Sequence, residues 1–411
     1  MGSAVRQVVI NPVSPENLLD PVPLYREMRN QAPVFWSELV HAWFITRHED
    51  VVSCFRDSRL SANRTRFYEV QLRGMDVEVI QELTQSLRHQ VGMKDGAEHQ
   101  RVRRMVNPGF TPQMLDAWRP AIRRIMDSLV DRIESLGRMD LFLEIAHQLP
   151  PLVIAEILGI PTEDRDRFQA WVQPIAEFTS PAMGVDVAAL ARRATASMKE
   201  FNAYLLKVIE ERRRAPGDDV LSRMIHTQEE GGLSQDELVA NVNLILSAGH
   251  VTTTDQLSNL MYDLLTHPEQ YQKLRSDRSL LASTVEEGVR FTPAMPYIHR
   301  IAVEDVQLHG KTIRKGDVVF LGLASSNRDP EIFPDPDTFD IARNPSQQKT
   351  MTFAFGPHYC LGSGLARREL EIALDVLLER LPGLQLDERI PPRVKCNTLL
   401  FRGFDSLPVR W

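Results

Sequence analysis

The chain has 411 residues, of which 43% are hydrophobic and 25% are charged, and its formal net charge is -7. This composition is sufficient for a large buried core, and the mild negative charge argues against a general surface for nucleic acid or anionic membranes. No linker interrupts the sequence, so we expect a single domain over residues 1–411, although the length alone would allow more than one.

The start of the chain and its cysteines indicate the compartment. Residues 1–23 hold several prolines and no apolar run of signal-peptide length, and no later segment reaches about 18 uncharged apolar residues. We therefore expect no export, no membrane anchor and a cytoplasmic location. Cys54, Cys360 and Cys396 are too sparse for a disulfide framework, which favours a reducing compartment.

The first half of the chain is rich in helical patterns, with a few strand-like patches. Pro23 stands in an opening helical turn, where its missing N–H costs nothing. The predicted elements are a helix over 23–29, a strand over 42–47, a basic helix over 98–106, helices over 114–136 and 141–158, and a long basic helix over 188–213.

The longest predicted helix runs from Ser234 to His267. Ser234 and Glu237 form a capping box at its start, and Pro268 ends it. Its middle, LILSAGHVTTT, is almost uncharged, which predicts that this part is buried. Beyond it we expect strands over 298–321 with turns at Gly310 and Gly316, a long irregular loop over 327–347 and a last helix over 361–381.

The strongest motif is Phe353-Ala-Phe-Gly-Pro-His-Tyr-Cys360-Leu-Gly362, directly before the last helix. The free N–H groups and positive dipole of a helix N-terminus lower a thiol pKa and favour the thiolate of Cys360. A thiolate is the strongly donating axial ligand with which a haem iron cleaves O–O bonds. Gly356 and Gly362 let the backbone approach a flat macrocycle, and Phe353 can shield the sulfur. A buried, inert cysteine is the alternative, but it leaves these fixed offsets unexplained.

On these residues the chain resembles the cytochrome P-450 family, in particular its soluble bacterial class, from DPVPLYREMRNQAPV to the C-terminal RGFDSLPVRW. The resemblance implies a mainly α fold with a small β-rich lobe, arranged as one triangular domain. It also implies a haem b cofactor (iron protoporphyrin IX) with Cys360 as the metal ligand. The implied activity is that of a monooxygenase, which inserts one atom of O2 into a C–H or C=C bond and releases the other as water.

Glu287 and Arg290 form an E-x-x-R motif, whose spacing places both residues on one face of a helix. In the family this pair joins an arginine of the later irregular loop, and Arg343 matches that position. The resemblance implies that this network supports the loop carrying Cys360 and takes no part in the chemistry. An ordinary surface pair is the alternative.

Four basic residues match the family's contacts to the haem propionates. His99 and Arg103 lie four apart on the basic helix and share a face. Arg300 and His358 match two further contacts. The two haem carboxylates would lie in a dry site, where they need cationic partners. The alternative interpretation is that each of these four basic residues is an ordinary solvated surface residue.

The centre of the longest helix matches the family's oxygen-activation motif, A-G-x-acid-T. Ala248, Gly249 and Thr252 fit it, and the resemblance gives Thr252 the task of guiding protons. Val251 departs from the family, which usually has Asp or Glu there, and a valine cannot carry a proton. Either water and Thr252 suffice, or oxygen activation is altered; Asp255, one turn further, could be a substitute.

The electrons are expected from separate proteins, a ferredoxin and its ferredoxin reductase, because the chain has no flavin or nicotinamide fingerprint. A basic surface near the haem would attract an acidic ferredoxin, although an ordinary solvated surface explains the same residues equally well. From the resemblance we also expect a monomer. The candidate docking residues are Arg101, Arg104, Arg367 and Arg368.

The family builds its substrate pocket from five segments, which correspond here to residues 62–93, 165–195, 244–252, 292–298 and 399–404. Their mainly apolar content suits a hydrophobic small molecule such as a polyketide, terpene, macrolide or fatty acyl group, free or carrier-bound. A charged head group could meet Arg64, Arg66 or Arg73. The predicted pocket residues are Leu244, Ala248, Pro293, Ala294, Met295, Leu400 and Phe401.

Two other functions remain open for the sequence. A haem-thiolate enzyme with other chemistry, such as peroxide use, C–C coupling or dehydration, is motivated by Val251. A non-catalytic haem sensor or carrier is the second, although it would not need Gly249 and Thr252.

Overall fold

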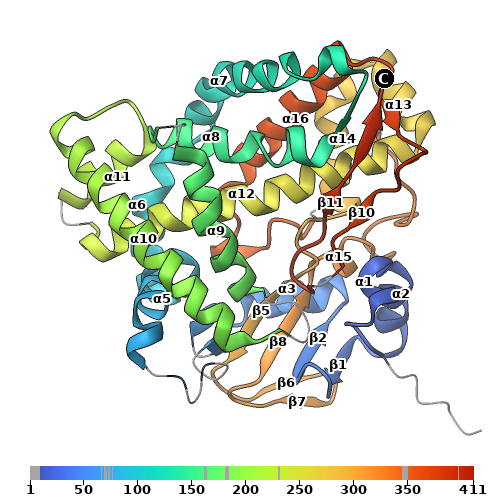
Figure 1. Cartoon of the computed structure of the whole chain (residues 1–411). Helices are drawn as coiled ribbons and strands as arrows, with labels where there is room; N and C mark the ends of the chain where they lie inside the picture. Colours follow the sequence, from blue (N-terminus) through green and yellow to red (C-terminus); the bar gives the residue numbers. More distant parts are fainter. Residues whose placement is uncertain are drawn as a thin grey trace, which may run out of the picture.

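A single 32-residue helix, α12 (Gln235–Thr266), crosses the molecule and organises the fold (Figure 1). It begins with the predicted capping box: Ser234 Oγ accepts a hydrogen bond from Glu237 N at 3.1 Å, and the Glu237 carboxylate accepts one from Ser234 N at 3.1 Å. His267 closes the helix before Pro268. The predicted bounds are confirmed, whereas the predicted burial of residues 244–254 holds only in part, because Ala248 is exposed and several of its neighbours are partly buried.

The computed structural model describes residues 10–65, 67–68, 72, 75, 77–161, 164–180, 185–229, 232–344, 350–396 and 398–411. The remaining helices of this part are α1 (Pro15–Leu19), α2 (Val22–Gln31), α3 (His48–Arg56), α5 (Val77–His89), α6 (Gly96–Val106), α7 (Pro112–Asp131), α8 (Leu149–Ile157), α9 (Arg165–Thr179), α10 (Val187–Arg214), α11 (Val220–Glu229), α13 (Pro268–Ser276), α14 (Leu281–Phe291), α15 (Leu323–Ser326) and α16 (Ser363–Arg380).

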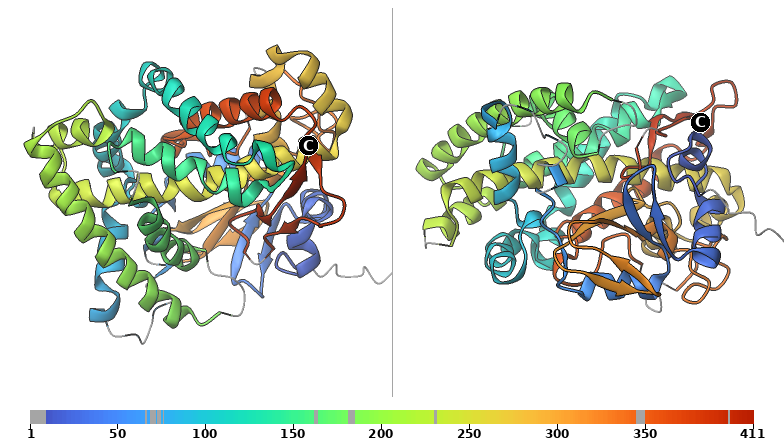
Figure 2. Two further views of the ribbon diagram at one scale, coloured as in Figure 1. Left: turned by 45° about the horizontal axis from the view of Figure 1, so that its top comes forward. Right: turned by 90° about the horizontal axis from the view of Figure 1, so that it is seen from below.

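The strands form one larger sheet and three small ones. The larger sheet has the order β1-β2-β8-β5-β3 and lies on the opposite side of α12 from α7 and α16 (Figures 1 and 2). The strands of this sheet are β1 (Val34–Ser37), β2 (Ala42–Ile45), β3 (Leu60–Ser61), β5 (Tyr297–Ala302) and β8 (Val318–Gly322).

The three small sheets share no strand with the larger one: β6 pairs with β7, β10 pairs with β11, and β12 lies between β4 and β9. All these pairs are antiparallel, whereas β2 and β8 run parallel. The bounds are β4 (Arg138–Asp140), β6 (Val306–Leu308), β7 (Lys311–Ile313), β9 (Gln385–Leu386), β10 (Arg393–Val394), β11 (Phe404–Ser406) and β12 (Pro408–Arg410).

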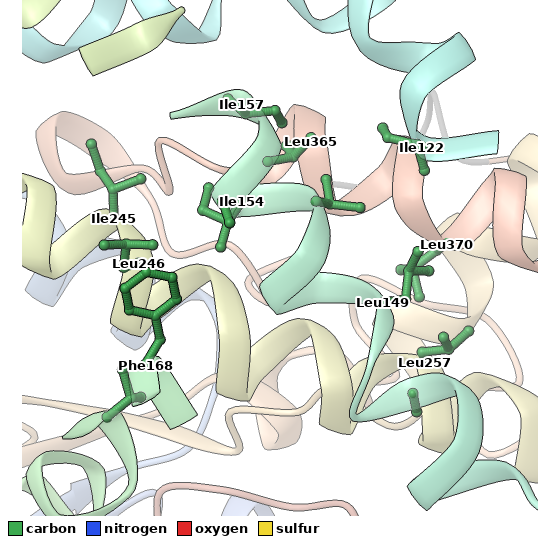
Figure 3. Close-up of a cluster of buried hydrophobic side chains, with 14 of the residues drawn as sticks. Ile122, Leu149, Ile154, Ile157, Phe168, Ile245, Leu246, Leu257, Leu365 and Leu370 are labelled. Carbon is green, nitrogen blue, oxygen red and sulfur yellow. The ribbon is translucent and has the colours of Figure 1, made fainter. Parts of the chain in front are cut away.

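The main core is built around α12, because α5, α8, α10, α14 and α16 all pack against it. Removing such apolar surface from water supplies the main driving force for folding. Figure 3 shows side chains of α7, α8, α9, α12 and α16 meeting in this cluster. Those labelled there are Ile122, Leu149, Ile154, Ile157, Phe168, Ile245, Leu246, Leu257, Leu365 and Leu370.

The sequence prediction failed at one helix. Residues 141–158 were expected to be one helix, but they divide into a π-helical turn, Phe142–Ala146, and α8. Pro150 and Pro151 lie in the first turn of α8 and lack the N–H groups that would continue a ladder from the preceding turn. Apolar spacing alone does not reveal such an interruption.

The fold is mainly helical with small sheets and a single domain, as expected. No helix among the described residues is long and apolar enough to cross a membrane.

Candidate functional site

Cys360 lies between a 3-10 turn, Gly356–His358, and the start of α16. Its N–H donates to Phe353 O at 2.9 Å, which closes the loop back on itself. Burial raises the pKa of the thiol, while the backbone N–H groups of Gly362 and Ser363 and the charge of Arg103 act in the opposite direction. The thiol is nevertheless solvent-accessible.

The backbone around the thiol is shaped by left-handed residues. Ala354 and Gly356 have φ values of 61° and 74°, a region that favours glycine and that Ala354 adopts at some cost. A Cβ on Gly362 would meet no heavy atom within 4 Å, so the backbone there faces open space. Phe353 lies beside the loop with the Arg367 guanidinium 4.3 Å from its ring centroid.

The four predicted propionate ligands come from α6, β5 and the Cys360 loop, and the structure brings them together. The rings of His99 and His358 have centroids 3.9 Å apart. Arg103 donates to Tyr359 O at 2.7 Å and so joins α6 to the Cys360 loop. Burial and then neighbouring basic groups lower the pKa of Arg300 to about 9 and that of His358 to about 3.

Arg64 belongs to the same cluster, a position that sequence reasoning did not assign to it. Burial is the main cause of the low pKa values of Arg300 and His358, and the positive charge of Arg64 adds to both shifts. The Nε atom of Arg64 has no hydrogen-bond partner among the described residues. The nearby carboxylate, Asp95, is bound by Ser61 and by Ala62 N, and its Oδ1 lies 3.9 Å from His358 Nε2. Arg66 and Arg73, the other two predicted head-group contacts, lie outside the described residues.

These residues fit the two carboxylates of a haem. His99 is 2% exposed and its Nε2 has no hydrogen-bond partner within the described chain, as is also true of Arg64 Nε. Burying cationic groups next to one another is unfavourable unless an anion accepts their hydrogen bonds. Two propionates beside the open face of Gly362 and the Cys360 thiol would supply that charge and those acceptors.

The predicted E-x-x-R network is formed by buried groups. Glu287 makes two hydrogen bonds of 2.7 Å with Arg290, and both side chains are 1% exposed. Arg343 Nε lies 3.1 Å from Glu287 Oε2. The two arginines donate to backbone carbonyls of the irregular loop, at Asn327, Pro334, Asp335, Pro336 and Thr338.

Asn327 carries this network on to the Cys360 loop, a role the sequence analysis missed. Its Oδ1 accepts from Met351 N at 2.6 Å, and its Nδ2 donates to Thr352 Oγ1 at 2.7 Å. Thr352 in turn donates to Val289 O on α14. Asn327 and Thr352 have ordinary surroundings in the sequence, so no local pattern identified them.

The predicted oxygen-activation residues lie on one turn of α12. Ala248 is exposed and its neighbours Ser247 and Gly249 are partly buried, and Thr252 Oγ1 donates to Ala248 O at 2.8 Å. A Cβ on Gly249 would lie 3.4 Å from Ile154 Cγ1, so this glycine permits close packing of α12 on α8. Its predicted role in leaving room for dioxygen remains a prediction.

The predicted pocket residues lie in different surroundings. Pro293 and Ala294 are buried. Met295 packs against the cluster formed by β3, β5, β8 and α3, and Leu400 against the cluster beneath α2. Leu244 is partly buried against the main core, and Phe401 lines a cavity between helices α1 and α2 and the C-terminal hairpin, which is formed by β10, β11 and the residues that connect them.

Three of the four arginines proposed for ferredoxin docking are held by acidic neighbours. Arg101 Nη2 lies 2.5 Å from Glu237 of α12, so it joins α6 to the start of that helix. Arg367 pairs with Glu286, and Arg368 pairs with Asp116 at 2.9 Å. Arg104 is exposed and remains the clearest candidate.

A mainly helical fold with a cysteine thiol beside clustered arginine and histidine side chains is the arrangement that a haem-thiolate protein requires. The family model for Cytochrome P450 matches residues 65–400. Cytochrome P450 CYP107DY1 of Priestia megaterium is 35% identical over 408 residues, covering 96% of this chain and 97% of that protein. The polyketide biosynthesis cytochrome P450 PksS of Bacillus subtilis is 32% identical over 416 residues, covering 98% and 99%.

A solved structure of P450BioI in complex with an acyl carrier protein ligated to hexadec-9Z-enoic acid superposes with a TM-score of 0.87. It is 31% identical, covering 96% of this chain and 100% of that one. The chain therefore belongs to the cytochrome P450 family; it is a P450 monooxygenase, and haem is the cofactor that this membership implies.

Proposed function

We propose that this monooxygenase hydroxylates or epoxidises a hydrophobic small molecule of secondary metabolism, using electrons from a separate ferredoxin and ferredoxin reductase. The observation that carries the proposal is the placement of Cys360: the residue is exposed directly before α16, and Arg103 donates to the carbonyl oxygen of the adjacent Tyr359 at 2.7 Å. An axial thiolate is the ligand that supports oxygen insertion.

Each group of residues has a distinct task in this proposal. Cys360 would hold the iron, and His99, Arg103, Arg300 and His358 would bind the propionates. The Thr252 hydroxyl, one turn from Ala248, would pass protons within the site. When bound, the haem supplies the reductive activation of O2, and the protein supplies binding, orientation and protons.

A polyketide or fatty acyl group, free or attached to a carrier protein, is the proposed substrate class. The predicted pocket residues are apolar, which suits such chains. PksS belongs to polyketide biosynthesis and P450BioI binds an acyl carrier protein, and both relatives align over nearly the whole chain.

The first test is the absorbance spectrum of the dithionite-reduced protein with carbon monoxide, for wild type and for Cys360→Ala. We expect the red-shifted Soret band that gives the family its name, and its loss in the variant. A wild type without that band, or a band that survives the substitution, would overturn the thiolate assignment.

A second test separates the enzyme from a haem sensor or carrier. Polyketide and fatty acyl compounds that shift the haem spectrum would be incubated with NAD(P)H and a surrogate ferredoxin pair. Oxygenated product in proportion to NAD(P)H consumed supports the monooxygenase, whereas binding without turnover of any compound supports the carrier.

Val251 motivates a second candidate function, a haem-thiolate enzyme that uses peroxide in place of O2 and electrons. The side chain is partly buried against the main core and carries no ionisable group. Faster product formation with hydrogen peroxide than with NAD(P)H and the ferredoxin pair would favour it.

A further inference from the structure

The half of α12 that follows Thr252 carries an unusual stripe of buried polar side chains. Asp255, Asn259 and Asp263 recur every four residues, Gln256 lies three residues before Asn259, and all four are at most 5% exposed. Such a stripe would be costly in a core unless each polar atom had a hydrogen-bond partner.

The two amides of this stripe hold the neighbouring pocket segments by their backbones. Gln256 donates to Thr292 O at 3.1 Å and accepts from Ala294 N at 3.0 Å. Asn259 donates to Thr292 O at 3.2 Å and to Arg402 O at 3.0 Å. Both amides are therefore accounted for by structure.

Asp255 differs from them because half of its carboxylate has no structural partner. The side chain is fully buried; Oδ1 accepts from Lys395 Nζ at 2.7 Å, and Oδ2 has no partner in the described chain. Burial raises the pKa of Asp255 to about 6, although Lys395 opposes the shift; Asp405 is the other charged group facing it and adds to the rise. The carboxyl group can therefore exchange a proton near neutral pH.

Two residues of the hairpin beside α12, Gly403 and Lys395, lie against this carboxylate. Gly403 lies so close that a Cβ there would come within 2.8 Å of three atoms of Asp255. Lys395, whose side chain is 20% exposed, also lines the cavity between the hairpin and α1 and α2, together with Asn17 and Thr398. Lys395 thus lies between a mainly apolar cavity and the buried acid, and its partly exposed side chain reaches solvent.

Asp255 also stands in the right place along the helix. Residues three apart share one face of an α-helix, with Cβ atoms about 5–6 Å apart, so Asp255 lies one turn beyond Thr252. Between Ala248 and Thr252, Val251 has no ionisable group, and burial lowers the pKa of His250 to about 3, so His250 carries no proton to donate near neutral pH.

We propose that Asp255, recharged through Lys395, is the proton-donating carboxyl group for the Thr252 turn. Resting on the proposed monooxygenase function, it acts through Thr252 and not directly on the reacting atoms. In each transfer Asp255 gives its proton, through bridging water, toward the Thr252 hydroxyl, and the resulting carboxylate takes one from the Lys395 ammonium. Lys395, which is partly exposed, regains its proton from solvent, while the electrons come from the ferredoxin.

The test compares Asp255→Asn with Asn259→Ala, which disturbs the same hairpin and pocket segments without removing an acid. We expect Asp255→Asn to keep haem and the carbon monoxide band. Product per NAD(P)H should fall by about 10- to 100-fold, at or below the usual contribution of acid–base catalysis, with hydrogen peroxide released in its place. Restoring an acid at the other position, in Val251→Glu/Asp255→Asn, should recover coupling.

The pH profile adds a measurement that a structural role would not move. Wild-type coupling should fall as pH rises above about 6, because the protonated fraction of Asp255 declines, and Asp255→Asn should lose this dependence. Independently of turnover, difference infrared spectra should show a carboxylic acid band that titrates near that pH in wild type and is absent in Asp255→Asn.

Either of two results overturns this proposal. In the first, Asp255→Asn matches Asn259→Ala, with weaker substrate binding but wild-type coupling; in the second, no titrating band is assigned to Asp255. A wild type without the carbon monoxide band would instead remove the proposed function itself. If Asp255→Asn does not fold, Lys395→Met replaces it in the test. This variant keeps the acid but removes its proton source, so it should lower the product formed per NAD(P)H.

Discussion

The Arg290 guanidinium is a fully buried charge that pairs with Glu287 on its own helix and donates to backbone carbonyls of the irregular loop. Arg290→Met would leave Glu287 buried with only Arg343 as its cationic partner, and losing half of a buried pair costs about 3–5 kcal/mol. We expect that loss in the free energy of unfolding, measured by denaturant titration, together with poorer haem retention.

Arg26 provides the matched control for Arg290. It pairs with Asp337 at 2.6 Å, but its side chain is 59% exposed. Exposed pairs are worth about 0–1 kcal/mol, so Arg26→Ala should change little. Equal losses in the two variants would contradict the role given to the buried network.

Arg64 offers a second prediction at the residue scale. If its unpartnered Nε serves a propionate, Arg64→Met should release haem to apomyoglobin at least about 10-fold faster, since a charged hydrogen bond contributes about 1.5–3 kcal/mol. Arg59→Met removes an exposed arginine five residues earlier, paired with Asp57, and should leave the rate unchanged. No change in Arg64→Met would return Arg64 to the substrate pocket, as first predicted.

At the scale of elements, Glu237 joins α6 to the first turn of α12. Burial opposes ionisation of Glu237, but hydrogen bonds from Arg101, Ser234 N and Lys94 outweigh it and lower the pKa to about 2. A depressed folded-state pKa gives stability that is full above the unfolded value, 4.5, and is lost as pH falls toward about 2.

Glu237→Gln should therefore destabilise the fold by about 1.5–3 kcal/mol at pH 7. The difference between variant and wild type should shrink as pH falls below about 4.5, which urea titrations at several pH values would measure. A difference that stays constant with pH would show that the charge of Glu237 contributes nothing and that its shape alone matters.

The elements show what the sequence could reveal. Residues 234–267 were predictable because a capping box, an apolar centre and Pro268 all agree. Residues 141–158 were not, since the apolar spacing continues through a π-helical turn. Helical periodicity reports which side chains face the core, and it carries little information on where the hydrogen-bond ladder is interrupted.

At the scale of the whole molecule, the rate of electron supply depends on the charges of the surface to which the redox partner binds. Arg104→Glu should slow reduction by the ferredoxin about 10-fold at low salt, the lower end of electrostatic steering, and weaken the dependence on ionic strength. Stopped-flow reduction would measure this. Arg275→Glu on α13 makes the same change of charge elsewhere and should have no effect; equal slowing in both would indicate net charge alone.

The site was predictable in unequal parts across the molecule. The family resemblance that rests on the Cys360 motif also indicated four basic positions, and the structure places them close together: His99, Arg103, Arg300 and His358. Phe401 and Leu400 share a segment yet face different surroundings, since irregular loops have no periodicity from which orientation follows. The sequence could not show that Arg64 and Asp255 each have a buried polar atom without a hydrogen-bond partner, because burial and partners depend on the folded structure.

Arg290 and Arg343 hold the loop over residues 327–344 through backbone carbonyl oxygens. A contact of this kind does not depend on the side chain of the accepting residue, whereas Phe333, Phe339 and Ile341 of the same loop are buried in the core. Exposed positions such as Pro334 and Thr338 are therefore free to change in evolution, or to be replaced in the laboratory for solubility or labelling, while the position of Cys360 stays fixed.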